Sequence, residues 1–196
     1  IKGVAEPGKK HMTITSQIEH HAVINACSAL GRLGYPVVYL PVNADGIVTP
    51  DVLEKVITTQ TKLVSVMLVN NEIGTVEPIC ELAAVAHAST ALFHTDAVQA
   101  VGHIPIDVNE LCVDMLSASA HKFNGPKGVG FLYVRKGTLL SPYVDGGAQE
   151  YGMRAGTENV ASIVGMATAL KKSCDEMQQT TAKLRMMENI FIDTLS

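Results

Sequence analysis

Two side chains suited to amine chemistry, Asp96 and Lys122, each close an apolar, strand-like run of the sequence. Asp96 follows residues 91–95, and Lys122 follows residues 115–121. A carboxylate can hold the positive charge of a pyridinium nitrogen, and a primary amine can form a Schiff base with an aldehyde. These are the two groups that a protein supplies to pyridoxal 5'-phosphate (PLP). We therefore predict that both face a single PLP cofactor.

The elements that would position these groups alternate between strand and helix. Strands are predicted at 12–15, 37–40, 63–69, 92–95, 115–118 and 130–134, and helices at 20–33, 51–57, 78–88, 158–172 and 174–195. This order predicts an α/β fold, a three-layer, mainly parallel sheet flanked by helices. Ligands of such sheets lie beyond the carboxyl ends of the strands. Asn71, Asp96 and Lys122 each follow a predicted strand, so we expect one shared pocket.

Composition favours a globular, intracellular domain. The chain has 196 residues, of which 47% are hydrophobic and 17% charged, values typical of a folded domain. The formal net charge of −4 and the scattered Lys and Arg residues disfavour a nucleic-acid partner. No apolar run approaches the length of a membrane span, and the start does not resemble a signal peptide. We expect a cytoplasmic protein with no membrane contact.

The four cysteines, Cys27, Cys80, Cys112 and Cys174, are widely spaced along the chain. They include no CxxC pair for zinc or redox chemistry. Cys27 and Cys80 lie in apolar helical patterns, and free cysteine packs as a small hydrophobe. We therefore predict that both are buried free thiols.

Ordered motifs span nearly the whole chain. They are IEHHAV at 18–23, VNNEIG at 69–74, HTDAVQ at 94–99, SAHKFNGPKG at 119–128, GGAQE at 146–150 and MRAGTEN at 153–159. Together they closely resemble the cysteine desulfurase group of class V, fold type I PLP enzymes. The resemblance implies that residues 1–196 are a partial PLP-binding large domain. The family's N-terminal phosphate-binding turn and its C-terminal small domain would lie outside this chain.

The resemblance also implies roles for individual residues. Asp96 would hold the pyridinium nitrogen, and Gln99 would bond the phenolic oxygen of PLP. His20 would stack on the ring and relay protons, and Asn71 would lie near the cofactor oxygen and the substrate carboxylate. The phosphate ligands would be Ser119, His121 and, reaching into a neighbouring subunit, Thr157. A role for Thr157 across subunits would make a homodimer functional.

Lys122 would form the Schiff base, with Lys127 in the following turn as its competitor. The glycines after Lys122 suggest an enclosed amine, and enclosure lowers the pKa of an amine. A solvated surface lysine is the ordinary alternative. For Asp96 the alternative is a helix cap or a salt bridge, and for Thr157 it is N-capping of the helix predicted from Glu158. Capping and phosphate binding can coexist at one helix terminus.

The implied activity is PLP-dependent removal of sulfur from L-cysteine, which gives alanine and an enzyme persulfide. The persulfide would form on a cysteine outside this chain and pass to a sulfur-acceptor protein. Alone, the chain is expected to turn over weakly or not at all. Selenocysteine lyase and other class V enzymes share most of these motifs.

Two alternatives come from other classes of protein. One is a non-catalytic dimerisation or scaffold domain that keeps the fold. The other is a metal hydrolase that uses the set His20, His21, His94, Asp96 and His121. These histidines form no HExxH motif or other dense ligand set, which disfavours a metal centre.

Overall fold

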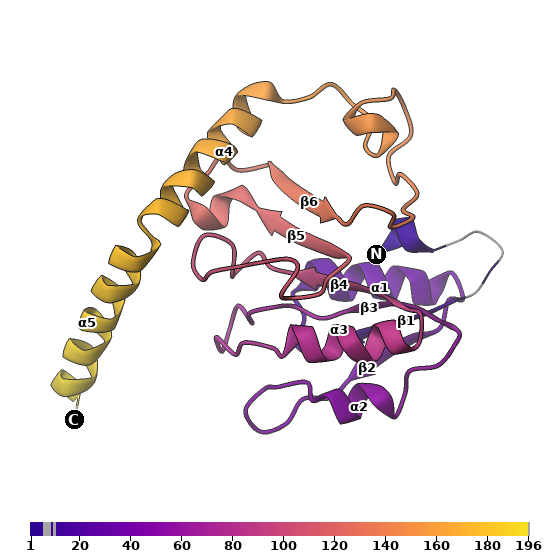
Figure 1. The fold of residues 1–196 in the computed structure, drawn as a ribbon, viewed down its shortest axis with the longest axis horizontal. Helices are drawn as coiled ribbons and strands as arrows, with labels where there is room; N and C mark the ends of the chain where they lie inside the picture. The colour runs from indigo at the N-terminus through magenta and orange to yellow at the C-terminus, as the bar shows by residue number, and fades with distance from the viewer. Residues whose placement is uncertain (6–8, 10, 196) are drawn as a thin grey trace.

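Strands and helices alternate through the first half of the computed structural model, which describes residues 1–5, 9 and 11–195 (Figure 1). The strands are β1 (Met12–Ser16), β2 (Val37–Leu40), β3 (Thr61–Ser65), β4 (Leu92–Asp96), β5 (Met115–Ser119) and β6 (Gly130–Val134). The α-helices are α1 (His21–Arg32), α2 (Pro50–Glu54), α3 (Ile79–Ala88), α4 (Val160–Asp175) and α5 (Met177–Leu195). The 3-10 helices are η1 (Lys2–Val4), η2 (Ala120–Phe123) and η3 (Glu150–Gly152). The predicted α/β class is confirmed.

The strands form one six-stranded sheet in the order β2-β1-β3-β4-β5-β6. The pairs from β2 to β5 are parallel, and only β6 is antiparallel to its neighbour. In this register Asp96 of β4 lies opposite Ser117 of β5. Because the parallel strands point the same way, their carboxyl ends meet at one edge of the sheet. The prediction of a mainly parallel sheet is therefore correct.

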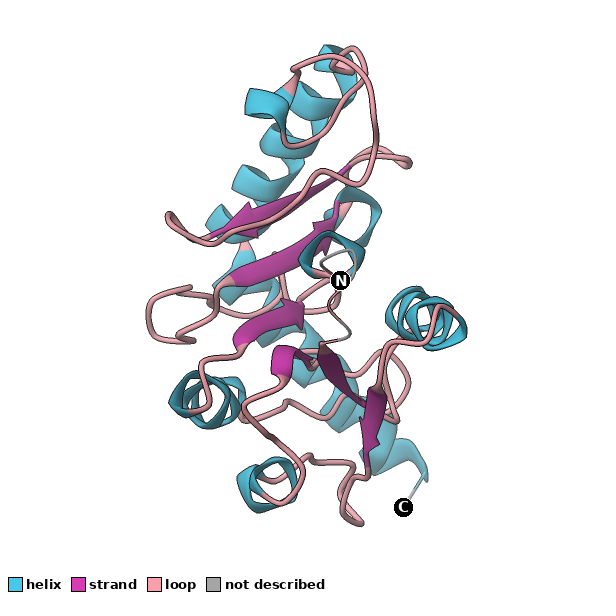
Figure 2. Ribbon diagram, turned by 90° about the vertical axis from the view of Figure 1, so that its right-hand side faces the viewer, coloured by secondary structure: helices cyan, strands magenta, loops and turns pink. Residues whose placement is uncertain are grey.

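Helices cover both faces of the sheet (Figure 2). The chain leaves β1 through α1 toward β2, and it leaves β3 through α3 in the opposite direction, toward β4. Right-handed crossovers in opposite directions place their helices on opposite faces. Since α2 contacts α3, α1 covers one face while α2 and α3 cover the other. This is the predicted three-layer arrangement.

The core lies between the central strands and these helices. Ile14 of β1, Phe93 of β4 and Leu82 of α3 are fully buried in one hydrophobic cluster. Every residue of β4 after Leu92 is buried, as expected for a strand covered on both faces. Burying a side chain as large as Phe93 stabilises the fold by about 1.5–3 kcal/mol relative to exposure. The apolar runs thus anchor the strands whose ends carry the polar residues.

Local capping sets where the helices begin. Thr49 is the N-cap of α2, and Pro50, whose fixed φ suits a first helical turn, is its first residue. The prediction for α4 was wrong: the helix begins at Val160, and Asn159 is its N-cap. The Asn159 side chain accepts a hydrogen bond from the Ser162 N–H at 3.2 Å. Thr157 therefore lies outside the helix and does not cap it.

Two other boundaries differ from the prediction. β3 ends at Ser65, although a strand was expected to continue to residue 69. Residues 66–68 stay buried, and their backbone still donates to β4, with Leu68 N–H bonded to the Asp96 carbonyl at 2.9 Å. The apolar run therefore reflects burial beyond the regular strand. Helix α4 also runs to Asp175, so the break from α5 falls at Glu176 rather than before Cys174.

Helix α5 extends away from the sheet (Figure 1). It exposes several large apolar side chains, among them Leu184, Ile190, Phe191 and Leu195. Within the described ranges, no helix has both the length and the apolar character needed to cross a membrane.

Candidate active site

The carboxyl ends of β1, β3, β4 and β5 lie side by side, because these strands are consecutive in the sheet and parallel. The strand order reverses between β1 and β3, since the connections from these two strands run in opposite directions. In open α/β sheets such a switch point opens a crevice where ligands bind. The loop after β1 carries His20, and the loop after β3 carries Asn71. His20 and Asn71 therefore lie on the two loops that flank the position favoured by topology.

Asp96 is the last residue of β4, and only 7% of it is exposed. Its Oδ1 accepts a hydrogen bond from the Val98 N–H at 2.9 Å. Burial raises the pKa of this carboxyl, while the Val98 bond and the nearby His20 partly offset that rise. A carboxylate in this position is stabilised by any further cationic donor.

His20 is the N-cap of α1, and its Nδ1 accepts a hydrogen bond from the Ala22 N–H at 3.2 Å. A neutral imidazole whose Nδ1 accepts must carry its proton on Nε2. Its exposed ring is close enough to Asp96 to affect the pKa of that carboxyl. His21 starts the helix and is also exposed. The geometry leaves Nε2–H of His20 available to a ligand.

Glu19 is a buried residue that the sequence prediction passed over. Its Oε1 accepts hydrogen bonds from Ser16 Oγ at 2.7 Å and from the Met67 N–H at 2.8 Å. Burial raises the pKa of Glu19 to about 8; the two hydrogen bonds lower this pKa in part, and the charge of Asp96 adds to the rise. Glu19 therefore joins the loop after β1 to the segment after β3 as an uncharged acid at neutral pH. Its place beside His20 in the IEHHAV motif was the available signal.

The loop after β3 is held by Asn70. Its Nδ2 donates to the Ile18 carbonyl at 2.8 Å, and its Oδ1 accepts from the N–H groups of Glu72 and Ile73. Asn70 thus fixes the loop itself. Asn71 is partly exposed, and its Nδ2 donates to Glu72 Oε1 at 2.7 Å. Its side chain is therefore only partly covered by the rest of the chain.

Ser119, His121 and Lys122 follow one another from the end of β5 into η2. Ser119 Oγ and His121 Nδ1 are 2.8 Å apart. The Lys122 backbone carbonyl accepts a hydrogen bond from His103 Nε2 at 2.8 Å. The side chain of Lys122 is exposed, so the predicted enclosure is wrong for this chain. Phe123, the next residue, is buried, and Lys127 in the following turn is also exposed.

Gln99 and Thr157 differ in their relation to the sheet edge. Gln99 is half-buried in the turn that follows β4, three residues after Asp96. Thr157 is exposed in the loop between η3 and α4. The other predicted site residues lie at strand ends or in the segments that follow them, whereas Thr157 lies in the loop before α4.

A second buried acid, Glu77, lies below the loop after β3. Its Oε2 accepts a hydrogen bond from the Val48 N–H at 2.8 Å, and burial raises its pKa to about 7. Four buried oxygens have no hydrogen-bond partner within the described chain: Thr15 Oγ1, Glu19 Oε2, Glu77 Oε1 and Thr95 Oγ1. Polar atoms of this kind cost free energy when they stay unpaired. These four oxygens make the buried interior around them more polar than a purely apolar core.

The metal-hydrolase alternative finds no support in the histidine geometry. His94 is buried, with Nδ1 2.8 Å from Ser65 Oγ and Nε2 2.7 Å from Ser117 Oγ, so neither nitrogen is left for a metal. Burial lowers the pKa of His94 to about 3, which keeps the ring neutral. Among residues 1–5, 9 and 11–195, no three His, Cys, Asp or Glu side chains gather as possible ligands.

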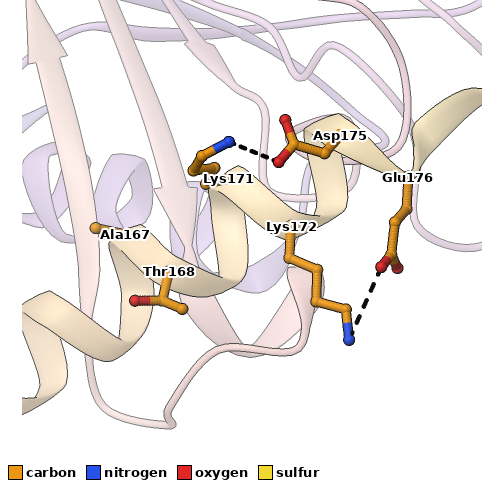
Figure 3. A pocket seen from close by; sticks show the side chains of 6 residues that line it. All are labelled: Ala167, Thr168, Lys171, Lys172, Asp175 and Glu176. Carbon is orange, nitrogen blue, oxygen red and sulfur yellow. Dashed lines mark hydrogen bonds and ion pairs between the residues drawn. The ribbon is translucent and has the colours of Figure 1, made fainter.

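A surface hollow on α4 is distinct from this site (Figure 3). It is lined by Ala167, Thr168, Lys171, Lys172, Asp175 and Glu176. Lys171 pairs with Asp175 at 2.6 Å, and Lys172 lies 3.9 Å from Glu176. These charges are balanced by pairs one helical turn apart, which is ordinary for an exposed helix. The hollow has no unpaired charge that would recognise a ligand.

Comparison with known protein families shows which family this chain belongs to. The family model described as "Aminotransferase class-V" matches residues 1–195. The chain belongs to the aminotransferase class-V family. Its relatives include "Cysteine desulfurase IscS" of Dictyoglomus turgidum, which is 53% identical over 98% of this chain and 49% of the relative. The mitochondrial cysteine desulfurase of Drosophila melanogaster is 44% identical over 100% of this chain and 43% of the relative.

Solved structures agree with this membership. A "NifS-like protein" superposes with a TM-score of 0.94 at 40% identity, covering 99% of this chain and 54% of that one. A structure titled "SspA in complex with cysteine" has a TM-score of 0.81 at 42% identity, over 87% of this chain and 49% of that one. This class-V chain thus spans about half the length of the relatives it matches.

Proposed function

We propose that this class-V chain binds PLP at the carboxyl edge of the sheet and carries the cofactor part of a cysteine desulfurase. The observation that supports it most is the state of Asp96. The carboxyl is buried, its pKa is raised, and the only hydrogen bond described for it is to Oδ1. A cationic N–H donor at Oδ2 would stabilise the charged form. The pyridinium nitrogen of PLP is a donor of that kind.

The donors near η2 fit the other end of the cofactor. Ser119 and His121 place a hydroxyl and an imidazole 2.8 Å apart at the end of β5. Hydroxyl and imidazole N–H groups both donate to phosphate oxygens. We propose that Ser119 and His121 hold the phosphate and that Gln99 bonds the phenolic oxygen. In this arrangement, Thr157 reaches the phosphate of a neighbouring subunit in a homodimer.

When bound, PLP supplies an electron sink that stabilises negative charge on the carbon next to the substrate amine. Lys122 then supplies the amine that holds the cofactor covalently, and its exposure gives it access from the open edge. His20 presents Nε2–H because Nδ1 is occupied by the cap of α1. It is therefore ready to stack on the ring and pass a proton there. Asn71 would donate to the cofactor oxygen or to a substrate carboxylate.

The proposed substrate is L-cysteine, which would yield alanine and an enzyme persulfide. The similarity to proteins named cysteine desulfurase and to a structure solved with cysteine supports this choice. We propose that residues 1–196 form part of the PLP-binding large domain, that the protein acts in the cytoplasm, and that a sulfur-acceptor protein takes the product. Selenocysteine is the alternative substrate, and comparing the rates of alanine release from the two amino acids would decide between them.

The test is reductive trapping. The chain is mixed with PLP, reduced with borohydride, digested and analysed by mass spectrometry. We expect a visible absorption band on mixing and a pyridoxyl label on Lys122. Lys122→Arg should abolish both, whereas Lys127→Arg, a matched control in the same exposed stretch, should leave them unchanged. A label spread evenly over both lysines, or one that survives Lys122→Arg, would refute the proposal.

A second variant tests the acid. Asp96→Asn removes the charge and keeps the shape of the side chain. A hydrogen bond to a charged group is worth about 1.5–3 kcal/mol, so PLP should bind about tenfold to a hundredfold more weakly. The measurement is titration of the visible band. Unchanged affinity in a folded Asp96→Asn chain would mean that this carboxyl does not face the cofactor.

A further inference from the structure

Two free thiols lie together on the surface, one on α3 and one in the turn before β5. Cys80 is in the first turn of α3, and Cys112 lies shortly before β5. Their sulfur atoms are 3.9 Å apart, and both side chains are exposed. The prediction that Cys80 is buried was therefore wrong, whereas the prediction for Cys27 is confirmed.

Cys112 is held in place by its own turn. Its φ of 55° is in the left-handed region that few non-glycine residues adopt. Its N–H donates to the Asn109 carbonyl at 3.1 Å, and its Sγ lies 3.3 Å from the same oxygen. Such a backbone persists only when its surroundings fix it. The backbone conformation and these two contacts therefore fix the position of the Cys112 thiol.

Arg135 fixes this turn from outside. Its Nη2 donates to the Val108 carbonyl at 2.7 Å and its Nε to the Val113 carbonyl at 3.0 Å, on either side of Cys112. Its Nη1 also donates to Asn109 Oδ1 at 3.1 Å. Three bonds from one planar guanidinium hold the turn in a single shape.

The same segment is docked on α3 at a second point. Asp114 Oδ2 lies 2.9 Å from His87 Nε2 in the last turn of α3 and accepts from the Phe93 N–H at 2.7 Å. Contacts at Cys80 and His87 therefore align residues 107–114 along the helix. This alignment keeps the two sulfur atoms facing each other.

We propose that Cys80 and Cys112 form a reversible disulfide that joins α3 to the turn before β5. A disulfide requires a sulfur separation of about 2.05 Å. The remaining gap is closed by rotation of two exposed side chains, because the backbone contacts already hold the partners together. The disulfide would close a covalent loop from Cys80 to Cys112. This loop contains β4, the strand that ends at Asp96.

The oxidant is a small disulfide, which reacts by thiol–disulfide exchange. The Cys80 S–H donates to Cys112 Sγ, and this bond raises the pKa of Cys80. Cys112 is therefore the first nucleophile. Its thiolate bonds to one sulfur of the small disulfide and expels the other as a thiolate. Cys80 then loses its proton, attacks Cys112 Sγ and expels the second thiolate. Two protein thiols are oxidised, and one small disulfide is reduced to two thiols.

The test uses the whole chain in buffers with graded ratios of reduced to oxidised glutathione. Samples are quenched with acid, digested without reduction and analysed by mass spectrometry. We expect a cross-linked peptide containing Cys80 and Cys112 that disappears with excess dithiothreitol. Because the thiols already face each other, their effective concentration exceeds millimolar glutathione, so the cross-link should outnumber glutathione adducts at these residues by about tenfold.

Cys174, an exposed thiol on α4, is the matched control. It should carry only a glutathione adduct, and Cys174→Ser should leave the cross-link unchanged. In Cys80→Ser, Cys112 should stop at the mixed disulfide with glutathione. Persistent adducts on Cys80 and Cys112 at the level of Cys174, without a cross-linked peptide, would overturn the proposal.

Discussion

Glu19 should make the stability of the chain fall as pH rises. The folded chain keeps the Glu19 proton up to about pH 8, whereas an unfolded chain loses it near the ordinary value of 4.5. Between these two values the folded state binds more protons than the unfolded state. Unfolding then releases a proton, so the free energy of unfolding decreases with increasing pH. The contribution is fully present below the ordinary pKa and is lost as pH approaches the folded value.

The size of the effect follows from the shift. Each pKa unit corresponds to about 1.36 kcal/mol, so raising the pH from about 5 to about 8 should cost about 3.5 kcal/mol at this one group. Glu19→Gln removes the titration. Its amide oxygen can still accept from Ser16 Oγ and the Met67 N–H, the two bonds that Oε1 makes now. We therefore expect the variant to match the original chain at acidic pH and to be more stable near pH 8.

The assay is urea unfolding of both chains at a series of pH values. Other titrating groups, including Glu77, are common to both, so the difference between the two curves isolates Glu19. That difference should grow by about 3.5 kcal/mol over the interval. Parallel curves would show that Glu19 is already ionised in the folded chain, and the account of its burial would then be wrong.

Five further variants test the packing and the N-cap of α4. Phe93→Ala, at a fully buried ring, should lower the free energy of unfolding by about 3–5 kcal/mol in urea, while Leu139→Ala, at a side chain 83% exposed, should change it little. Gly130→Ala would push a Cβ into the Ala118 carbonyl of β5, and a cost of about 1–3 kcal/mol in the same assay is expected. Asn159→Ala should lower the free energy of unfolding by about 1 kcal/mol because the N-cap of α4 is lost, whereas Asn159→Asp should leave that free energy unchanged. Equal urea midpoints for the original chain and both Asn159 variants would contradict this.

Periodicity predicted the elements well because burial follows it. The spacing of Val23, Cys27 and Leu30 indicated a helix, and these are the buried residues of α1. The same reasoning could have placed Cys80 correctly. The buried face of α3 is formed by Ile79, Leu82, Ala83 and Ala86. Cys80 follows the first of these by one residue, about 100° around the helix, and therefore points away from the core.

Strand order and side-chain exposure were harder to predict. Spacing alone could not show that β1 lies between β2 and β3, because that depends on pairing between distant segments. Asp96 was identifiable as a carboxylate that ends an apolar run. The exposure of Lys122 was not, since glycines in the following turn do not reveal what covers the amine. Thr157 and Asn159 were both possible caps, and Asn is the stronger N-cap residue.

The strand order reverses between β1 and β3, and the residues that pack the fold are distinct from those of the proposed site. Packing depends on the strands and on the helices that cross in opposite directions, whereas the proposed site residues lie at the strand ends and in the segments that follow them. Substitutions in those segments can therefore retune selectivity without disturbing the layers beneath. A scaffold of this kind is well suited to evolutionary diversification and to directed redesign.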